Sequence, residues 1–270
     1  MMSSRSTILL LFTVFLVTAC RKEDEQPTQV DVVMMIDHAF TGKAILPVFA
    51  HLQSMQLGPG RWTPTGNMDC VELDSISGDT LAFPTGGPVT LHLRFLSPGC
   101  VGLDGTERGG IVHVSYDSIA DGGARISDLY TTDLTAGGIR VRFGATVTTL
   151  GPASSTLLLD SSYMHAFGDW SERLRGTVTY SLQNAPFDSV PDDDHYTVQS
   201  DLLGMDRNGR SYGAISTESV GISMECAWIT GGVETFVVDD AIERRLVHGA
   251  GCDGQVELHA NENVFGLTIP

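Results

Sequence analysis

The chain has 270 residues, 42% of them hydrophobic and 30 of them glycine, and its formal net charge at pH 7 is −17. A charge of that size and sign repels nucleic acid and anionic lipid surfaces, so the composition argues against nucleic acid as a partner. The apolar content suffices for a buried core, and the glycines predict many turns rather than long helices.

Residues 1–19 have the pattern of a lipoprotein signal peptide. Arg5 precedes a largely apolar run from Ile8 to Val17, and small residues stand directly before Cys20. The run is shorter than the roughly 20 apolar residues that a membrane-spanning helix needs, and its order is typical of a secretory leader. Val17-Thr18-Ala19-Cys20 resembles a bacterial lipobox, which implies that Cys20 becomes the first residue and carries covalent lipid. The predicted protein is therefore held at a membrane by acyl chains.

Residues 20–31 predict a flexible acidic tether, because they are charged and lack apolar periodicity. Arg21-Lys22-Glu23-Asp24-Glu25 resembles the export signal of surface lipoproteins in the Bacteroidetes, in which a basic residue leads an acidic run. That resemblance implies an outer-membrane lipoprotein exposed at the cell surface. A plain solvated linker is the alternative, and it would leave the domain at the periplasmic face.

A helical segment is predicted over residues 32–58, ending at Gly58-Pro59-Gly60. Apolar residues recur there at helical spacing, at Ile36, Phe40, Ala44, Val48, Leu52 and Met55. Pro47 lacks the amide hydrogen that a helix interior needs, so we expect a kink or a break near Leu46.

Residues 61–270 are predicted to form a β domain, because the hydrophobic period changes to two. Apolar and polar residues alternate in four clear stretches, Val89–Phe95, Ile139–Phe143, Thr177–Leu182 and Gln255–His259. The turn sequences between such stretches predict roughly a dozen strands. The fold is therefore expected to be mainly β, an antiparallel β-sandwich or one folded, twisted sheet, with an N-terminal helical segment. Of the two arrangements we favour the sandwich.

Four cysteines follow Cys20, and the leader places them in an oxidising compartment where two disulfides are expected. Four cysteines permit three connectivities. Two weakly repeated units, 68–117 and 224–269, have the same order of cysteine contexts, and this favours Cys70 with Cys100 and Cys226 with Cys252. A zinc–thiolate site is the alternative, but such sites usually have C-x2-C or C-x4-C pairs, which the sequence lacks.

The two cysteine units resemble those of a group of uncharacterised Bacteroidetes lipoproteins. The second unit carries Cys226-Ala227-Trp228 and then Gly249-Ala250-Gly251-Cys252-Asp253, similar to the C-x-W and G-x-G-C-D signature of that group. The first carries Gly99-Cys100, followed by Asp104-Gly105 and an arginine that leads into a strand. The resemblance covers most of residues 68–269, and it implies no activity.

Two groups of side chains are candidate metal ligands. Asp188, Asp192, Asp193 and Asp194 crowd carboxylates together as a calcium site needs, but without the D-x-D-x-D-G spacing, so a solvated acidic loop is the alternative. His92, His113 and His259 fall on the polar faces of predicted strands and could hold a metal if those strands were neighbours. Solvent-facing histidines are the alternative. Apart from the covalent lipid on Cys20 and a calcium ion at these aspartates, the sequence predicts no cofactor.

Trp170 is the candidate ligand contact, since it is one of three tryptophans and lies in a polar, turn-like stretch. Trp228 is expected instead to pack near the Cys226 disulfide, on the same face of a strand. Asp169 and Glu172 flank Trp170 and resemble the carboxylate pair of a glycosidase, but in a chain with 33 acidic residues such pairs arise by chance.

No G-x-S-x-G, glycine-rich phosphate loop or H-E-x-x-H motif is present in the sequence, so we assign no catalytic residue and expect no enzyme activity. The predicted function is a lipid-anchored, surface-exposed domain that binds or displays a glycan or another envelope protein. The alternatives are a periplasm-facing structural or assembly component of the outer membrane and, third, a carbohydrate-active enzyme.

Overall fold

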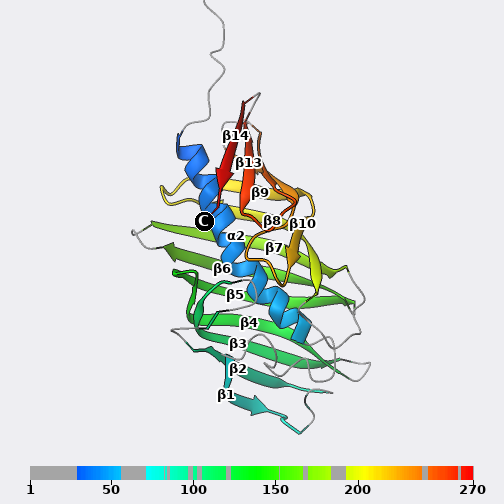
Figure 1. The fold of residues 1–270 in the computed structure, drawn as a ribbon. Coiled ribbons are helices and arrows are strands. Elements are labelled where there is room, and N and C mark those ends of the chain that lie inside the picture. Colours follow the sequence, from blue (N-terminus) through cyan, green and yellow to red (C-terminus); the bar gives the residue numbers. More distant parts are fainter. Residues whose placement is uncertain are drawn as a thin grey trace, which may run out of the picture.

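The computed structural model describes residues 29–55, 71–81, 83, 86–96, 100–101, 105–119, 123–151, 153–166, 170–183, 193–238, 243–260 and 263–269. Within them the chain forms one helix and one antiparallel sheet of 14 strands (Figure 1). The mainly-β class is confirmed, and of the two expected arrangements the structure has the single folded sheet rather than the favoured sandwich. The predicted leader, Cys20 and Cys70 lie outside the described residues, as does most of the tether.

The strands follow one another in space nearly as they do in the sequence. Their bounds are β1 Val71–Gly78, β2 Val89–Phe95, β3 Arg108–Ile119, β4 Gly123–Ala136, β5 Ile139–Gly151, β6 Ser154–Ala166, β7 Trp170–Leu182, β8 His195–Met205, β9 Ser211–Glu218, β10 Val220–Ser223, β11 Gly232–Val237, β12 Arg244–His248, β13 Gln255–Ala260 and β14 Asn263–Thr268. The order across the sheet runs from β1 to β14, except that β10 leaves this path and pairs with β8. Most strands therefore pair with their sequence neighbours.

Alternating burial gives the sheet an inner and an outer face. In β2 the odd-numbered residues Val89, Leu91, Leu93 and Phe95 are buried, and the residues between them are not. The same period runs through β5, and the four stretches predicted from the sequence are β2, β5, β7 and β13. The prediction of half-buried antiparallel strands is therefore confirmed.

Helix α2 (Gln29–Met55) lies diagonally across the inner face of the sheet (Figure 1). Its buried apolar side chains include Met34, Met35 and Phe49. The Phe49 ring packs on Tyr180 of β7 with 4.5 Å between ring centroids, and the Tyr180 hydroxyl donates to the Leu46 carbonyl at 3.2 Å. The helix thus covers the inner face of the sheet and completes the core.

The helix differs from its prediction in its limits and in its buried face. It begins at Gln29, and it continues through Pro47 without the expected break, since packing on both sides of the proline holds it in place. Ile36 and Phe40, predicted to be in the buried stripe, are only half-buried. The neighbouring Asp37 and His38 are buried instead.

By length and composition alone, the segment Asp31–Ala50 could cross a membrane. In the structure most of this segment is buried by the sheet, and its two aspartates bind arginines of the sheet. Within this fold it is the core helix of the domain.

A disulfide joins Cys226 to Cys252 across a separation of 26 residues, as predicted, and it encloses β11 and β12. Cys100 is disulfide-bonded as well, and Cys70, its predicted partner, lies outside the described residues. Trp228 packs against the core as expected, but it stands in an irregular segment rather than on a strand. Its indole N–H donates to the Ile269 carbonyl at 2.9 Å, which ties that segment to the end of the chain.

Candidate functional site

Several polar side chains of α2 are buried against the sheet and have partners there, which makes a buried ionic cluster. The helical members are Asp31, Asp37, His38 and Thr41. Asp31 accepts hydrogen bonds from Arg210 at 2.5 Å and from Arg244 of β12 at 2.9 Å. Because two guanidinium groups flank one carboxylate, the first turn of α2 is tied to two separate parts of the sheet.

Asp37 is fully buried and forms a two-pronged ion pair with Arg207, whose Nε donates to Oδ2 at 2.6 Å and whose Nη2 donates to Oδ1. Burial raises the pKa of Asp37 above its ordinary value, and the positive charge and hydrogen bonds of Arg207 oppose that shift. A carboxylate with this degree of burial needs such a partner, so the Arg207 contact fixes where α2 can lie.

Arg207 and Arg210 both belong to the turn between β8 and β9. The Asp206 carboxylate accepts hydrogen bonds from the backbone N–H groups of Asn208 at 2.8 Å and Arg210 at 2.9 Å, and this fixes the turn. Asn208-Gly209 lies in this hairpin turn, which is not of type I′, because Gly209 has a positive φ of 79° and Asn208 does not. The carboxylate caps the turn instead, and both arginines are directed toward the helix.

His38 links the helix to a glutamate and a tyrosine of the sheet. Its Nε2 lies 3.3 Å from the Glu234 carboxylate of β11, and its Nδ1 lies 3.0 Å from the Tyr212 hydroxyl of β9. Burial lowers the pKa of His38, but the Glu234 charge and hydrogen bond outweigh it, so the net shift is upward. Burial likewise would raise the pKa of Glu234, whereas His38 and His248 together bring it well below the ordinary range. The contact therefore favours the protonated form of His38 and the ionised form of Glu234.

Glu172 of β7 is the acid of the buried ionic cluster whose pKa is raised into the neutral range. Its carboxyl group accepts hydrogen bonds from the hydroxyls of Thr41 and Tyr212, and it is 1% exposed. Burial raises the pKa of Glu172 to about 7, although His38 and the two hydroxyls act in the opposite direction. The acid is thus half-protonated close to neutral pH.

Tyr212 reaches Glu172 by lying over the backbone of β8. Gly204 pairs with Tyr212 across β8 and β9, and a Cβ atom built on Gly204 would overlap the Tyr212 ring. The absence of a side chain at position 204 therefore lets the phenol cross above β8 to the acid on β7.

The outer face of the same strands carries an open hollow of about 1320 Å³. Its outward-facing lining comes from β5 to β9 and β11: Arg142, Asp160, Tyr163, Arg173, Arg175, Leu203, Met205, Ser211 and Val237. Tyr212 and Leu174 also contribute to the lining. Strand alternation places Glu172 inside and Arg173 outside, so the buried ionic cluster holds the strand ends that form the hollow.

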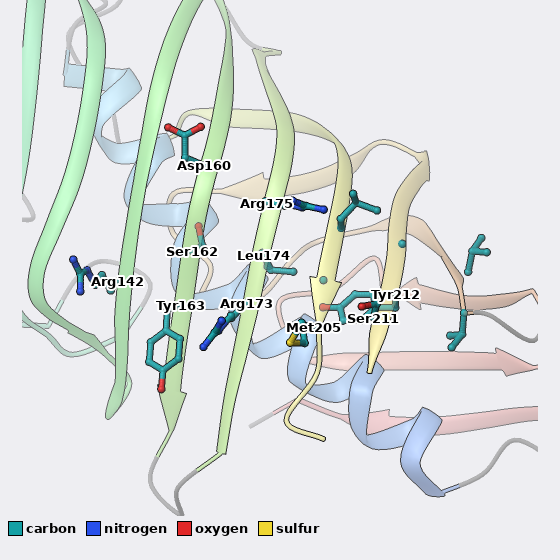
Figure 2. Close-up of a pocket in the computed structure, with 15 residues that line it drawn as sticks. Arg142, Asp160, Ser162, Tyr163, Arg173, Leu174, Arg175, Met205, Ser211 and Tyr212 are labelled. Carbon is teal, nitrogen blue, oxygen red and sulfur yellow. The ribbon is translucent and has the colours of Figure 1, made fainter. Parts of the chain in front are cut away.

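Three arginines stand on one side of the hollow. Arg142 pairs in register with Tyr163, Tyr163 with Arg173, and Arg173 with Met205, so these side chains form one row across β5 to β8. Figure 2 shows this row, with Arg175 one pleat further along β7. Among the residues that the structure describes, no carboxylate forms an ion pair with Arg142, Arg173 or Arg175. In a chain of net charge −17 this row is a local concentration of positive charge.

Apolar side chains stand on the other side of the hollow. Leu203, Met205 and Val237 are 53%, 39% and 51% exposed. Leu203 and Val237 both pair in register with Gly213, which has no side chain to fill the space between them. The hollow therefore joins a cationic side to an apolar side.

Sequence reasoning did not find these lining residues. Arg173 and Arg175 occupy ordinary polar positions of an alternating strand, and such positions are usually solvated. The available signal was in β8 and β11, where Leu203, Met205 and Val237 fill positions that the alternation assigns to the solvent side.

Trp170, the predicted ligand contact, is the first residue of β7, where it pairs with Ala166; its side chain is outside what the structure describes. Of the suggested glycosidase pair, Asp169 is not among the described residues. Glu172 lies beneath the helix, so it is not in an open sugar-binding cleft. The position of Glu172 therefore does not support a glycosidase site formed by Asp169 and Glu172 near Trp170.

The three candidate histidines do not gather. His92 and His113 lie on the adjacent strands β2 and β3, with ring centroids 4.4 Å apart, and the ring of His113 stacks on Tyr130. His259 lies on β13 and contacts Glu257 at 3.1 Å. The proposed three-histidine site is therefore wrong, because β13 is far from β2 and β3 in the strand order.

Of the four candidate calcium ligands, Asp188 and Asp192 lie outside the described residues. Asp193 is exposed, and Asp194 is buried directly before β8. No group of three or more His, Cys, Asp or Glu side chains suited to a metal ion occurs in the described part of the chain. The calcium hypothesis remains a sequence prediction.

Replacing Glu172 with Gln should reduce the pH dependence of stability. A group whose pKa rises on folding stabilises the protein below its unfolded pKa and loses this contribution as pH rises through the folded value, here about 7. The wild-type free energy of unfolding should thus fall by about 2–3 kcal/mol between about pH 5 and pH 8 through this group. Urea denaturation of Glu172→Gln should show a smaller fall, whereas the exposed control Glu218→Gln should keep the wild-type profile. Equal profiles for wild type and Glu172→Gln would refute the assignment.

Gly204→Ala should destabilise the domain by at least about 2 kcal/mol, because the added methyl group displaces the Tyr212 ring and breaks its bond to Glu172. Gly213→Ala is the matched control on the neighbouring strand, since a Cβ atom there meets its nearest neighbour at 4.0 Å. Thermal or urea unfolding of the two variants measures the difference. If both variants had the same stability, Tyr212 would not depend on the bare backbone at Gly204.

Comparison of the chain with protein-family models, with curated proteins and with solved structures finds no match. The resemblance to uncharacterised Bacteroidetes lipoproteins stays a prediction from the sequence.

Proposed function

We propose that the protein is a lipid-anchored envelope protein, exposed at the cell surface, that acts by binding a ligand on the outer face of its sheet. The observation that carries this proposal is the hollow, in which three arginines that form no ion pair with a described carboxylate face the exposed apolar strip of Leu203, Met205 and Val237. Concave sites with a few convergent polar groups and an apolar wall are typical of ligand binding.

Binding is favoured over catalysis by the position of Glu172. Its pKa of about 7 would suit proton transfer at neutral pH. Its oxygens accept hydrogen bonds from Thr41 and Tyr212, and it is buried under α2, away from the outer side chains of the hollow. We therefore assign Glu172 to the contact between α2 and the sheet.

The predicted lipid anchor fits the position of the helix. Eight residues separate Cys20 from Gln29, the first residue of α2. Even fully extended, eight residues span at most about 28 Å, so a lipid on Cys20 would keep the domain close to the membrane surface. The N-terminal half of α2 carries Asp37 and His38, and it therefore lies next to the strands that form the hollow.

Surface placement is tested by adding protease to intact cells that express the full chain. The proposal predicts cleavage of the protein while a periplasmic marker stays intact, and loss of membrane attachment in a Cys20→Ala variant. Protection on intact cells with cleavage after the outer membrane is opened would favour a periplasm-facing structural component instead. Membrane attachment that survives Cys20→Ala would contradict the lipid anchor.

A further inference from the structure

We propose that the hollow binds an amphipathic anion, a molecule with a carboxylate, sulfate or phosphate group on an apolar body. This inference rests on the proposed binding function and names the class of ligand. Its anionic group would be held by Arg142, Arg173 and Arg175, and its apolar body would cover Leu203, Met205 and Val237.

The arginines are arranged to receive an anion. Arg173 and Arg175 are two residues apart on β7, so both project from the outer face. Arg142 of β5 lies in the same row as Arg173, because both residues pair in register with Tyr163 of β6. All three are exposed, and none is neutralised by a described carboxylate. A guanidinium group binds carboxylate, sulfate or phosphate oxygens through paired N–H donors, which favours this head group over a neutral one.

The apolar strip sets the direction of the rest of the ligand. Leu203 pairs with Arg175 across β7 and β8, and Met205 pairs with Arg173. The charged side chains of β7 therefore lie directly beside the apolar side chains of β8. Val237 continues the strip on β11, beyond Gly213 of β9. A ligand that covered these side chains would remove about half of their area from water, at roughly 25 cal/mol per Å².

The spacing of the strands sets the length of the apolar body. From β7 to β11 the sheet order passes β8 and β9, which gives three intervals between strands. At about 4.8 Å per interval, the strip extends about 14 Å from the arginines of β7, which suits a medium-length acyl chain.

The same hollow disfavours purely anionic and purely apolar ligands. The chain as a whole is strongly acidic, and Asp160 also lines the hollow, so an ion without an apolar body meets long-range repulsion. An apolar molecule without a charge would leave three guanidinium groups next to its surface unpaired.

The test measures binding of radiolabelled dodecanoate to the full chain, held in nanodiscs of zwitterionic lipid, by equilibrium dialysis against empty nanodiscs. The proposal predicts that dodecanoate binds saturably. Dodecanol and acetate should each bind at least about tenfold more weakly than dodecanoate. Arg173→Gln/Arg175→Gln should weaken dodecanoate binding by about tenfold or more. The control Arg140→Gln/Arg245→Gln removes the same charge from exposed positions outside the hollow and should bind like wild type.

The apolar side is tested in the same way with Leu203→Thr/Val237→Thr, since threonine is polar but β-branched and therefore suits a strand. It should weaken dodecanoate binding, whereas Ile215→Thr, an exposed apolar position outside the hollow, should not. Circular dichroism of each variant confirms that it is folded. Absence of saturable dodecanoate binding, or equal loss in the test and control pairs, would overturn the proposal.

Two further comparisons distinguish a membrane lipid from a free amphiphile as the ligand, and distinguish failure of the ligand class from failure of surface placement. Nanodiscs that contain an anionic phospholipid should compete with dodecanoate if the natural ligand is a membrane lipid, and should not compete if it is a free amphiphile; the arginine variants report on the hollow in both cases. A protein that is exposed on cells but does not bind dodecanoate would overturn the ligand class alone. A protein that binds dodecanoate but is protected on cells would overturn surface placement alone.

Discussion

The ion pairs beneath α2 are the constraint on which the rest of the structure depends. A carboxylate as buried as Asp37 or Asp31 is destabilising by several kcal/mol unless a cation stands beside it. The sheet offers such cations in the β8–β9 turn, as Arg207 and Arg210, and at the start of β12, as Arg244. The helix can therefore occupy one position on the sheet, whereas apolar packing alone would allow it to slide.

That position has consequences on the opposite face. Neighbouring residues of a strand point to opposite sides, so each inner contact fixes an outer side chain: Glu172 precedes Arg173, Met205 precedes Asp206, and Ser211 precedes Tyr212. The buried ionic cluster holds the ends of β7, β8 and β9, and these strands carry the central part of the hollow, between side chains of β5, β6 and β11. Rigid strands rather than loops thus present the arginines and the apolar strip, which favours a preformed binding site.

The sequence predicts the parts of this protein that follow from local periodicity. The alternation of β2, β5, β7 and β13 was readable because each strand has one solvated face, and the Cys226–Cys252 bridge was readable from two similar cysteine contexts. The buried side of α2 could not be predicted from the sequence, because Asp37 and His38 interrupt the apolar pattern and their partners lie more than 160 residues away in the sequence. The hollow was not predictable either, since its arginines look like ordinary solvated residues until the register places them in one row.

The most direct measurement of the central claim is a double-mutant cycle on Asp37 and Arg207, with urea unfolding of the full chain at neutral pH. If this pair holds α2 to the sheet, Asp37→Asn and Arg207→Gln should each destabilise the protein, and the double variant should be more stable than the sum of the two effects by about 2 kcal/mol. Arg207 is 32% exposed, so solvent keeps this coupling moderate. Additive effects within about 0.5 kcal/mol would contradict the claim, and would mean that apolar packing alone positions the helix.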